Sequence, residues 1–305
     1  MSWCKKIVAA LVLVAVGRAS AAELKAVRDE PVEPRRLTTD GLVKTSPTFV
    51  DRSGAELIYV VEDIATRMRL MRFRVDSGTG GATTSTPLHP DETRSEFEPT
   101  CSPDGRLISF IQSRGNLNLV LVIQELETKK EVVVSVGGGF SGPRSPAFTA
   151  DASRVCYSFA EEGRQHLFSV SAEGGESRKI VDSSGQNNWP NFAPDGKRMT
   201  FGSSRDADTE VYTVSTDGTN PKRLTTTPGL DARPRFSPDG KRICFTSNRD
   251  GNYEIYVMNA DGTDQRRLTN HPERDDYPTW HPDGKRLVFV GERNGKHDLY
   301  EIAVP

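Results

Sequence analysis

Cysteine, histidine and tryptophan are scarce in this chain of 305 residues, which contains 4 Cys, 5 His and 3 Trp. The histidines show no metal-binding spacing such as H-E-x-x-H, and the cysteines form no C-x-x-C pair. A P-loop and a G-x-S-x-G nucleophile motif are also missing. We therefore predict no catalytic residue, no metal ligand and no cofactor from these motifs.

Long apolar runs and basic clusters are equally rare. The one long run, residues 7–16, follows Lys5 and Lys6 and precedes the small residues Ala19, Ser20 and Ala21. This order is typical of a signal peptide cleaved after residue 21, and the run is too short to span a bilayer. Lysine and arginine are dispersed, so the charge pattern of a nucleic-acid-binding surface is missing. We expect a periplasmic or secreted protein that is not membrane-embedded and binds no nucleic acid.

What the sequence does contain is a repeat of about 44 to 52 residues. Each of six units has one proline near its start, and the six are Pro47, Pro99, Pro146, Pro190, Pro234 and Pro278. An apolar residue follows two positions later, and four units then carry a Pro-Asp-Gly turn. Alternating apolar runs between turns predict four short strands per unit. A four-stranded repeat of this length indicates an all-β, six-bladed β-propeller.

The last unit lacks its fourth strand, and the start of the chain supplies a candidate. The fourth strands of two other units read Arg223-Leu224-Thr225 and Arg267-Leu268-Thr269, and Arg36-Leu37-Thr38 has the same phase. We predict that residues 34–38 pair with residues 297–303 and close the ring, because an open ring would expose strand edges. The predicted domains are a signal peptide (1–21), a short linker (22–33) and the propeller (34–305).

The three cysteines outside the predicted signal peptide, Cys101, Cys156 and Cys244, occupy strand positions in different units. We expect them to be unpaired core thiols. A second recurring pattern places an aspartate ten residues before an arginine in four units. We interpret these pairs as structural bridges between two turns of one blade: Asp104 and Arg114, Asp195 and Arg205, Asp239 and Arg249, Asp283 and Arg293.

Function on a repeat scaffold is expected where the repeats differ. The first strand of each unit should line the central channel, and alternation would place positions three before, one before and one after the proline on one face. These positions predict a partner-binding channel mouth that includes Glu96, Glu98, Asn187, Trp189, Asp231, Arg233, Arg235, Asp275 and Tyr277. Two alternatives stay open: a merely solvated mouth, and a channel cation held by Glu96, Asp231 and Asp275.

The segment from Ser237 to Thr263, SPDGKRICFTSNRDGNYEIYVMNADGT, resembles the repeat of the TolB-like six-bladed propeller family. The resemblance extends over all six units and is weakest in the first three. It implies a periplasmic propeller that binds an envelope lipoprotein. The namesake has a further N-terminal domain before its propeller, and its absence here would make this chain a stand-alone relative. Related propellers accompany serine peptidases or serve as metal-dependent pectic-oligosaccharide lyases.

These observations favour a non-enzymatic, exported, monomeric scaffold that binds a protein or peptide of the cell envelope. The alternative is a metal-dependent lyase or hydrolase, or a small-ligand binder, that acts on carbohydrate or another small substrate through the channel.

Overall fold

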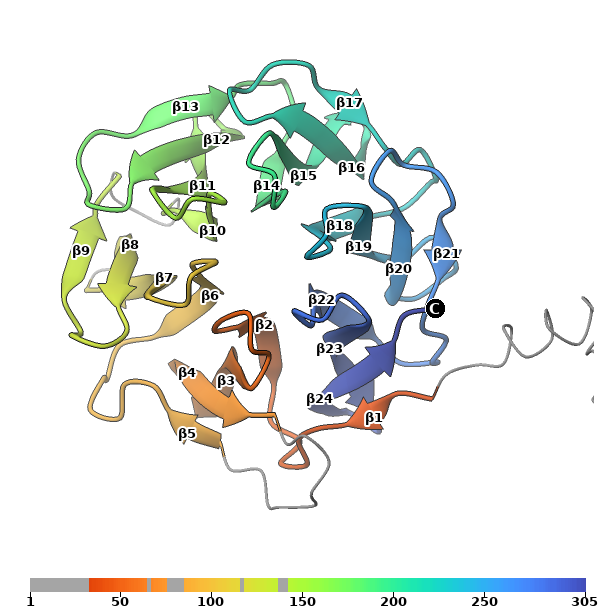
Figure 1. Ribbon diagram of the computed structural model, residues 1–305, viewed down its shortest axis with the longest axis horizontal. Coiled ribbons are helices and arrows are strands. Elements are labelled where there is room, and N and C mark those ends of the chain that lie inside the picture. Colours follow the sequence, from red (N-terminus) through yellow and green to blue (C-terminus); the bar gives the residue numbers. More distant parts are fainter. Residues whose placement is uncertain (1–32, 65–66, 76–84, 116–117, 137–141) are drawn as a thin grey trace, which may run out of the picture. The chain divides into compact units, whose positions relative to one another are not determined.

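The computed structural model describes residues 33–64, 67–75, 85–115, 118–136 and 142–305. The predicted signal peptide and all but the last residue of the predicted linker lie outside this part. Residues Pro34–Val304 form one compact unit, in which six four-stranded sheets surround a centre (Figure 1). All regular elements of the described residues are strands, and none of those residues belongs to a helix that could cross a membrane.

Each sheet is antiparallel and, in five of the six, follows chain order from the centre outward (Figure 1). The first sheet contains β2 (Lys44–Phe49), β3 (Glu56–Ile64), β4 (Arg67–Arg74) and β5 (Ser85–Pro87). The second contains β6 (Glu96–Cys101), β7 (Leu107–Arg114), β8 (Asn118–Glu125) and β9 (Glu131–Val134). The third contains β10 (Arg144–Phe148), β11 (Arg154–Glu161), β12 (Arg164–Ser171) and β13 (Arg178–Val181).

The second half of the chain builds the more regular sheets. The fourth contains β14 (Asn187–Phe192), β15 (Arg198–Asp206), β16 (Asp208–Ser215) and β17 (Lys222–Arg223). The fifth contains β18 (Asp231–Phe236), β19 (Arg242–Ser247), β20 (Glu254–Asn259) and β21 (Arg266–Arg267). The sixth combines β22 (Asp275–Trp280), β23 (Arg286–Arg293) and β24 (Lys296–Ala303) with β1 (Arg35–Arg36).

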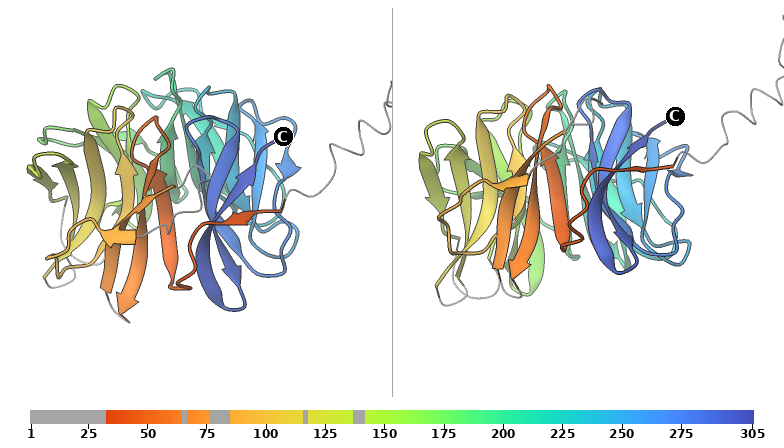
Figure 2. Two further views of the ribbon diagram at one scale, coloured as in Figure 1. Left: turned by 60° about the horizontal axis from the view of Figure 1, so that its bottom comes forward. Right: turned by 90° about the horizontal axis from the view of Figure 1, so that it is seen from below.

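The predicted closure is confirmed, because β1 pairs antiparallel with β24 through Arg35 and Arg36. Figure 2 shows β1 running beside β24. Thr38 donates to Asp298 at 2.7 Å, and the Leu299 amide donates to the Thr38 hydroxyl at 3.0 Å. Arg36 forms an ion pair with the same aspartate, which is buried.

The same contacts recur inside two blades, as the common Arg-Leu-Thr sequence predicts. Thr225 donates to buried Glu210 at 2.5 Å, and Arg223 pairs with that glutamate. Thr269 and Arg267 repeat this arrangement on Glu254. We call each set a clasp: an arginine of the fourth strand and the threonine two residues after it, both bound to one acid of the third strand. The clasp of β1 therefore closes the ring with an intra-blade interaction.

Apolar side chains pack mainly between neighbouring blades. Phe49, Leu57 and Tyr59 of the first sheet pack against Val288 and Leu299 of the sixth, which joins the two ends of the ring. Cys156 and Cys244 are buried in such clusters and Cys101 is partly buried. All three are free thiols, as predicted.

Candidate functional site: the central channel

The innermost strand of every blade has the same backbone irregularity one residue before its proline. These six residues have φ between 49° and 55°, a region that L-residues with side chains rarely adopt. The six are Ser46, Glu98, Ser145, Trp189, Arg233 and Tyr277. Each lies where the pairing of the first two strands shifts by one residue, which is a β-bulge. We call these six residues the constriction ring.

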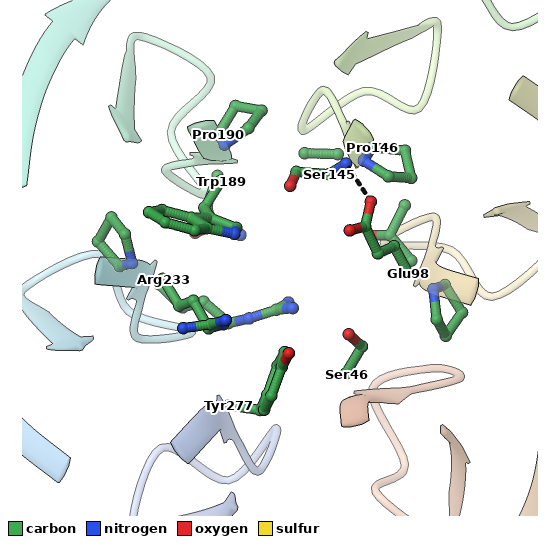
Figure 3. A pocket seen from close by; sticks show the side chains of 14 residues that line it. Ser46, Glu98, Ser145, Pro146, Trp189, Pro190, Arg233 and Tyr277 are labelled. Carbon is green, nitrogen blue, oxygen red and sulfur yellow. Dashed lines mark hydrogen bonds between the residues drawn. The ribbon is translucent and has the colours of Figure 1, made fainter. Parts of the chain in front are cut away.

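The constriction ring surrounds a narrow cavity of about 80 Å³ at the centre of the propeller (Figure 3). The guanidinium of Arg233 lies 4.1 Å from the ring centre of Tyr277 and 5.1 Å from that of Trp189. Its Nη1 lies 3.3 Å from Asp276. Two aromatic faces and a carboxylate therefore stabilise this cation, although its Nε has no hydrogen-bond partner among the described residues.

Glu98 stands across the narrow cavity from this aromatic pair (Figure 3). Its Oε2 accepts a hydrogen bond from the Ser145 amide at 2.6 Å. Burial raises the pKa of Glu98, and the Ser145 amide and the charges of Arg144 and Arg233 oppose this only in part. The ring thus presents an acid with a raised pKa opposite a cation between two aromatic rings.

Gly202 makes room for the indole of Trp189. A Cβ on Gly202 would lie 2.8 Å from Trp189 Cε3, which is closer than carbon atoms approach in folded proteins. Any side chain at residue 202 would therefore displace Trp189 from the constriction ring. The equivalent residues of the next two blades, Thr246 and Val290, carry side chains, so the repeat pattern does not predict a role for Gly202 in the channel.

Four of the predicted channel residues do not line the channel cavities. Glu96, Asn187, Asp231 and Asp275, each three residues before a proline, are buried within their blades. The bulge explains this correction. Asp231 pairs with Ser247 and Arg235 with Cys244, so the extra residue places positions three before and one after the proline on opposite faces.

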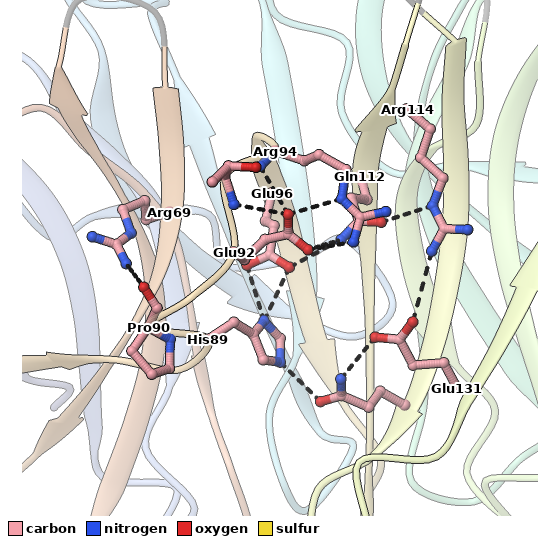
Figure 4. Close-up of polar contacts among 11 residues, drawn as sticks. Arg69, His89, Pro90, Glu92, Arg94, Glu96, Gln112, Arg114 and Glu131 are labelled. Carbon is pink, nitrogen blue, oxygen red and sulfur yellow. Dashed lines mark hydrogen bonds and ion pairs between the residues drawn. The ribbon is translucent and has the colours of Figure 1, made fainter.

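Glu96 belongs to a polar network inside the second blade (Figure 4). Both of its oxygens lie 3.0 Å from Nδ1 of His89, and Gln112 donates to it at 3.3 Å. Nε2 of His89 lies 2.9 Å from Gln124. Burial acts to lower the pKa of His89, but the hydrogen bond and charge of Glu96 outweigh it and raise this pKa. Glu96 therefore fixes the segment around His89, which connects β5 to β6, and does not face the channel.

The predicted Asp-Arg bridges are wrong in their partners. Arg249 pairs with Asp231 at 2.7 Å and Arg293 with Asp275 at 2.7 Å, while Arg205 donates to Asn187 at 3.2 Å. In the second blade, Arg114 donates to Gln112 at 2.8 Å.

The predicted partners of these arginines cap their own turns. Asp239 accepts from Ser237 and from the Lys241 amide. Asp104 makes the same two turn contacts, and Asp195 and Asp283 each accept the equivalent bond from a backbone amide. Aspartate and arginine stand at opposite ends of the second strand, about 20 Å apart for six residues of β19 (Arg242–Ser247).

A second, larger cavity of about 640 Å³ adjoins the constriction on the side of the Pro-Asp-Gly turns. The residues one after each proline line it, and we call them the floor ring: Thr48, Thr100, Ala147, Asn191, Arg235 and Thr279. The next residues outward form its aromatic wall: Phe49, Phe148, Phe192, Phe236 and Trp280. Of the predicted site, Glu98, Trp189, Arg233, Arg235 and Tyr277 therefore do line the channel.

The described residues contain no group of three or more His, Cys, Asp or Glu side chains placed to hold a metal ion. The three acids considered for a channel cation are engaged elsewhere, Asp231 and Asp275 with arginines and Glu96 with His89. They do not converge on the channel.

Comparison with known proteins agrees with the repeat. Residues 91–231 match the family model of the TolB β-propeller domain, and residues 211–304 match that of the Tricorn protease N-terminal β-propeller domain. Comparison with curated proteins finds no match.

Solved structures of the same fold come from several organisms. A protein identified as TolB from Agrobacterium tumefaciens is 21% identical, with a TM-score of 0.60, over 73% of this chain and 94% of its own. TolB from Acinetobacter baumannii is 20% identical, with a TM-score of 0.69, over 82% and 64%. An oligogalacturonate lyase from Vibrio parahaemolyticus is 15% identical, with a TM-score of 0.60, over 91% and 95%. The repeat, the family models and the shared architecture together show a six-bladed β-propeller whose repeats are similar to those of the TolB β-propeller domain.

Proposed function

We propose that this protein is an exported, non-enzymatic scaffold that binds a protein or peptide of the cell envelope at its central channel. The observation that carries this proposal is the constriction ring, in which Arg233 lies between Trp189 and Tyr277 on strained backbone. Backbone strain of this kind is common at binding and active sites. Tryptophan, tyrosine and arginine are also the residues that most often dominate binding energy at interfaces.

The blades supply the rigidity that such a site requires. Clasps join the third and fourth strands of the fourth and fifth blades, and Arg249, which follows the second strand of the fifth, pairs with Asp231 of its first strand. Side chains held in place before binding lose less conformational entropy when a partner arrives. The likeness to TolB proteins supports a periplasmic location and a protein partner, and the apolar run at residues 7–16 supports export.

Affinity capture from a native envelope extract tests this proposal. The bait is the wild type beside a Trp189→Ala, Tyr277→Ala double variant, with Tyr253→Ala as a control for loss of an aromatic ring outside the channel cavities. A channel-binding partner should be captured by the wild type and the control and lost, by at least about tenfold, with the double variant. Equal capture by all three would refute the channel as the binding site.

A further inference from the structure

The floor ring contains one charged residue whose surroundings differ from those of every other arginine discussed above. Arg235 lines the large cavity and is partly buried. Among the described residues it forms no ion pair and its side chain makes no hydrogen bond, whereas Arg233, Arg249 and Arg293 each lie against an aspartate. None of its nitrogens is among the buried side-chain atoms that lack a partner, so the unpaired guanidinium stays accessible from the cavity that it lines. Arginines in partly buried sites are normally paired with a carboxylate.

The electrostatic surroundings make Arg235 still less favourable without a ligand. Burial lowers the pKa of this guanidinium, and the nearby positive charge of Arg233 lowers it further, against an opposite effect of the Cys244 thiol. The carboxylate Glu98 acts on Arg233 and Arg144 rather than on Arg235. Among the described residues, Asp51 is the one acid in the wall of the large cavity, and its Oδ1 already accepts from the amide and hydroxyl of Ser53.

Uncharged donors and apolar walls complete the site. Thr48, Thr100 and Thr279 occupy the same register as Arg235 in three other blades and line the same cavity. The backbone of Arg235 is held in place, because Trp280 Nε1 donates to its carbonyl oxygen at 3.1 Å. A guanidinium fork suits the two oxygens of a carboxylate, hydroxyls can donate to the same group, and the aromatic wall suits an apolar body.

We infer that the large cavity binds an organic carboxylate carried on an apolar body, with the carboxylate on Arg235 and the body against the aromatic wall. Arg235 is the one cation of the floor ring, and Arg52, the other arginine of the cavity wall, is exposed at the rim, so we expect a monoanionic ligand rather than inorganic phosphate. Such a group occurs in small aromatic acids and at the C-terminus of a peptide that ends in an apolar residue. The inference deepens the proposed function, on which it rests, by naming the ligand chemistry of the same channel.

Thermal unfolding and calorimetric titration with defined probes test the inference. The probes are 3-phenylpropanoate and its amide, N-acetyl-alanyl-phenylalanine and its C-terminal amide, and inorganic phosphate. Wild-type protein should show an increase in Tm of about 3 °C at ten times the Kd of a carboxylate probe, and no increase with the amides or phosphate. The carboxylate probe that binds more tightly shows whether the natural ligand is a small free acid or the C-terminus of a peptide.

Two variants complete the design. Arg235→Gln should lose the carboxylate-dependent increase in Tm, and Arg52→Gln, an exposed arginine at the rim of the same cavity, should keep it. A cooperative thermal unfolding transition without ligand shows that each variant is folded. Equal shifts from acids and amides, equal shifts in Arg235→Gln, a matching shift from phosphate, or no shift from either carboxylate would overturn the inference.

The capture experiment fails or succeeds separately from these titrations. Partner capture that persists in Arg235→Gln but is lost in the Trp189→Ala, Tyr277→Ala variant would refute the carboxylate assignment and leave the scaffold function standing. Carboxylate binding without any captured partner would refute the protein-binding function and leave the ligand chemistry standing.

Discussion

The clasps at the outside of the blades and the two rings at the centre use the same residue types for opposite purposes. In the clasps, Arg36, Arg223 and Arg267 each pair with one buried acid, and a threonine hydroxyl donates to the same acid. At the centre, Arg233 depends on aromatic faces and Arg235 has no acid among the described residues. The repeated clasps hold this molecule together, whereas the unrepeated residues at the centre form the site where we propose that it binds a partner.

Removing the closing clasp should have the largest effect on stability. A chain that begins at residue 39 loses Arg36, Leu37 and Thr38, and buried Asp298 loses two of its partners. We expect its free energy of unfolding to fall by more than about 3 kcal/mol, measured by urea titration, relative to a chain that begins at residue 33. Equal stability of the two chains would show that β1 does not close the ring.

Acid should weaken the same clasp. Burial acts to raise the pKa of Asp298, but hydrogen bonds from Thr38 and Arg36 and the charge of Lys44 hold it below its ordinary value of 3.8. A depressed pKa stabilises the fold above the unfolded value, and this contribution is lost as pH falls through the folded pKa.

The variant Asp298→Asn isolates this contribution. It should be less stable than the wild type by about 1–3 kcal/mol at pH 7, because the charge-assisted hydrogen bonds are lost. The difference should shrink below about pH 4, as followed by urea unfolding at several pH values. A difference that stays constant down to pH 2 would contradict the assigned role of Asp298.

The smallest expected effect distinguishes the turn from the blade interior. Asp239→Ala removes the bonds from Ser237 and Lys241 and should cost about 1 kcal/mol. A double-mutant cycle of Asp239→Ala with Arg249→Met should give a coupling energy below about 0.5 kcal/mol. The cycle of Asp231→Asn with Arg249→Met should exceed that value. Strong coupling in the first cycle would restore the Asp-Arg bridge that the sequence predicts.

The number of blades and the closure were predictable because both depend on spacing along the chain. Leu37, Leu224 and Leu268 each precede a unit proline by ten residues, and all three occupy the same strand position. The ten-residue spacing from Asp239 to Arg249 led to a wrong prediction of an ion pair between them. Equal spacing places residues at equivalent positions of each blade but does not bring them into contact.

The channel was only partly predictable for a different physical reason. Alternation assigns faces correctly along a regular strand, but the bulge before each proline reverses the assignment. Nothing in the side chains of Ser46, Glu98 or Trp189 favours a positive φ, so their identity does not reveal the bulge. The repeated proline that follows them, which disfavours helical conformation in the preceding residue, is the one available signal.

The contrast between a paired and an unpaired arginine is tested most directly by replacing each with methionine. Arg249→Met leaves buried Asp231 without its partner and should lower the free energy of unfolding by about 3–5 kcal/mol. Arg235→Met removes an unpaired cation and should leave that free energy unchanged or raise it by up to about 2 kcal/mol. Urea unfolding of both variants beside the wild type measures the two changes. Equal losses of stability would show that Arg235 is a structural residue and would contradict the distinction between the paired arginines of the blades and unpaired Arg235.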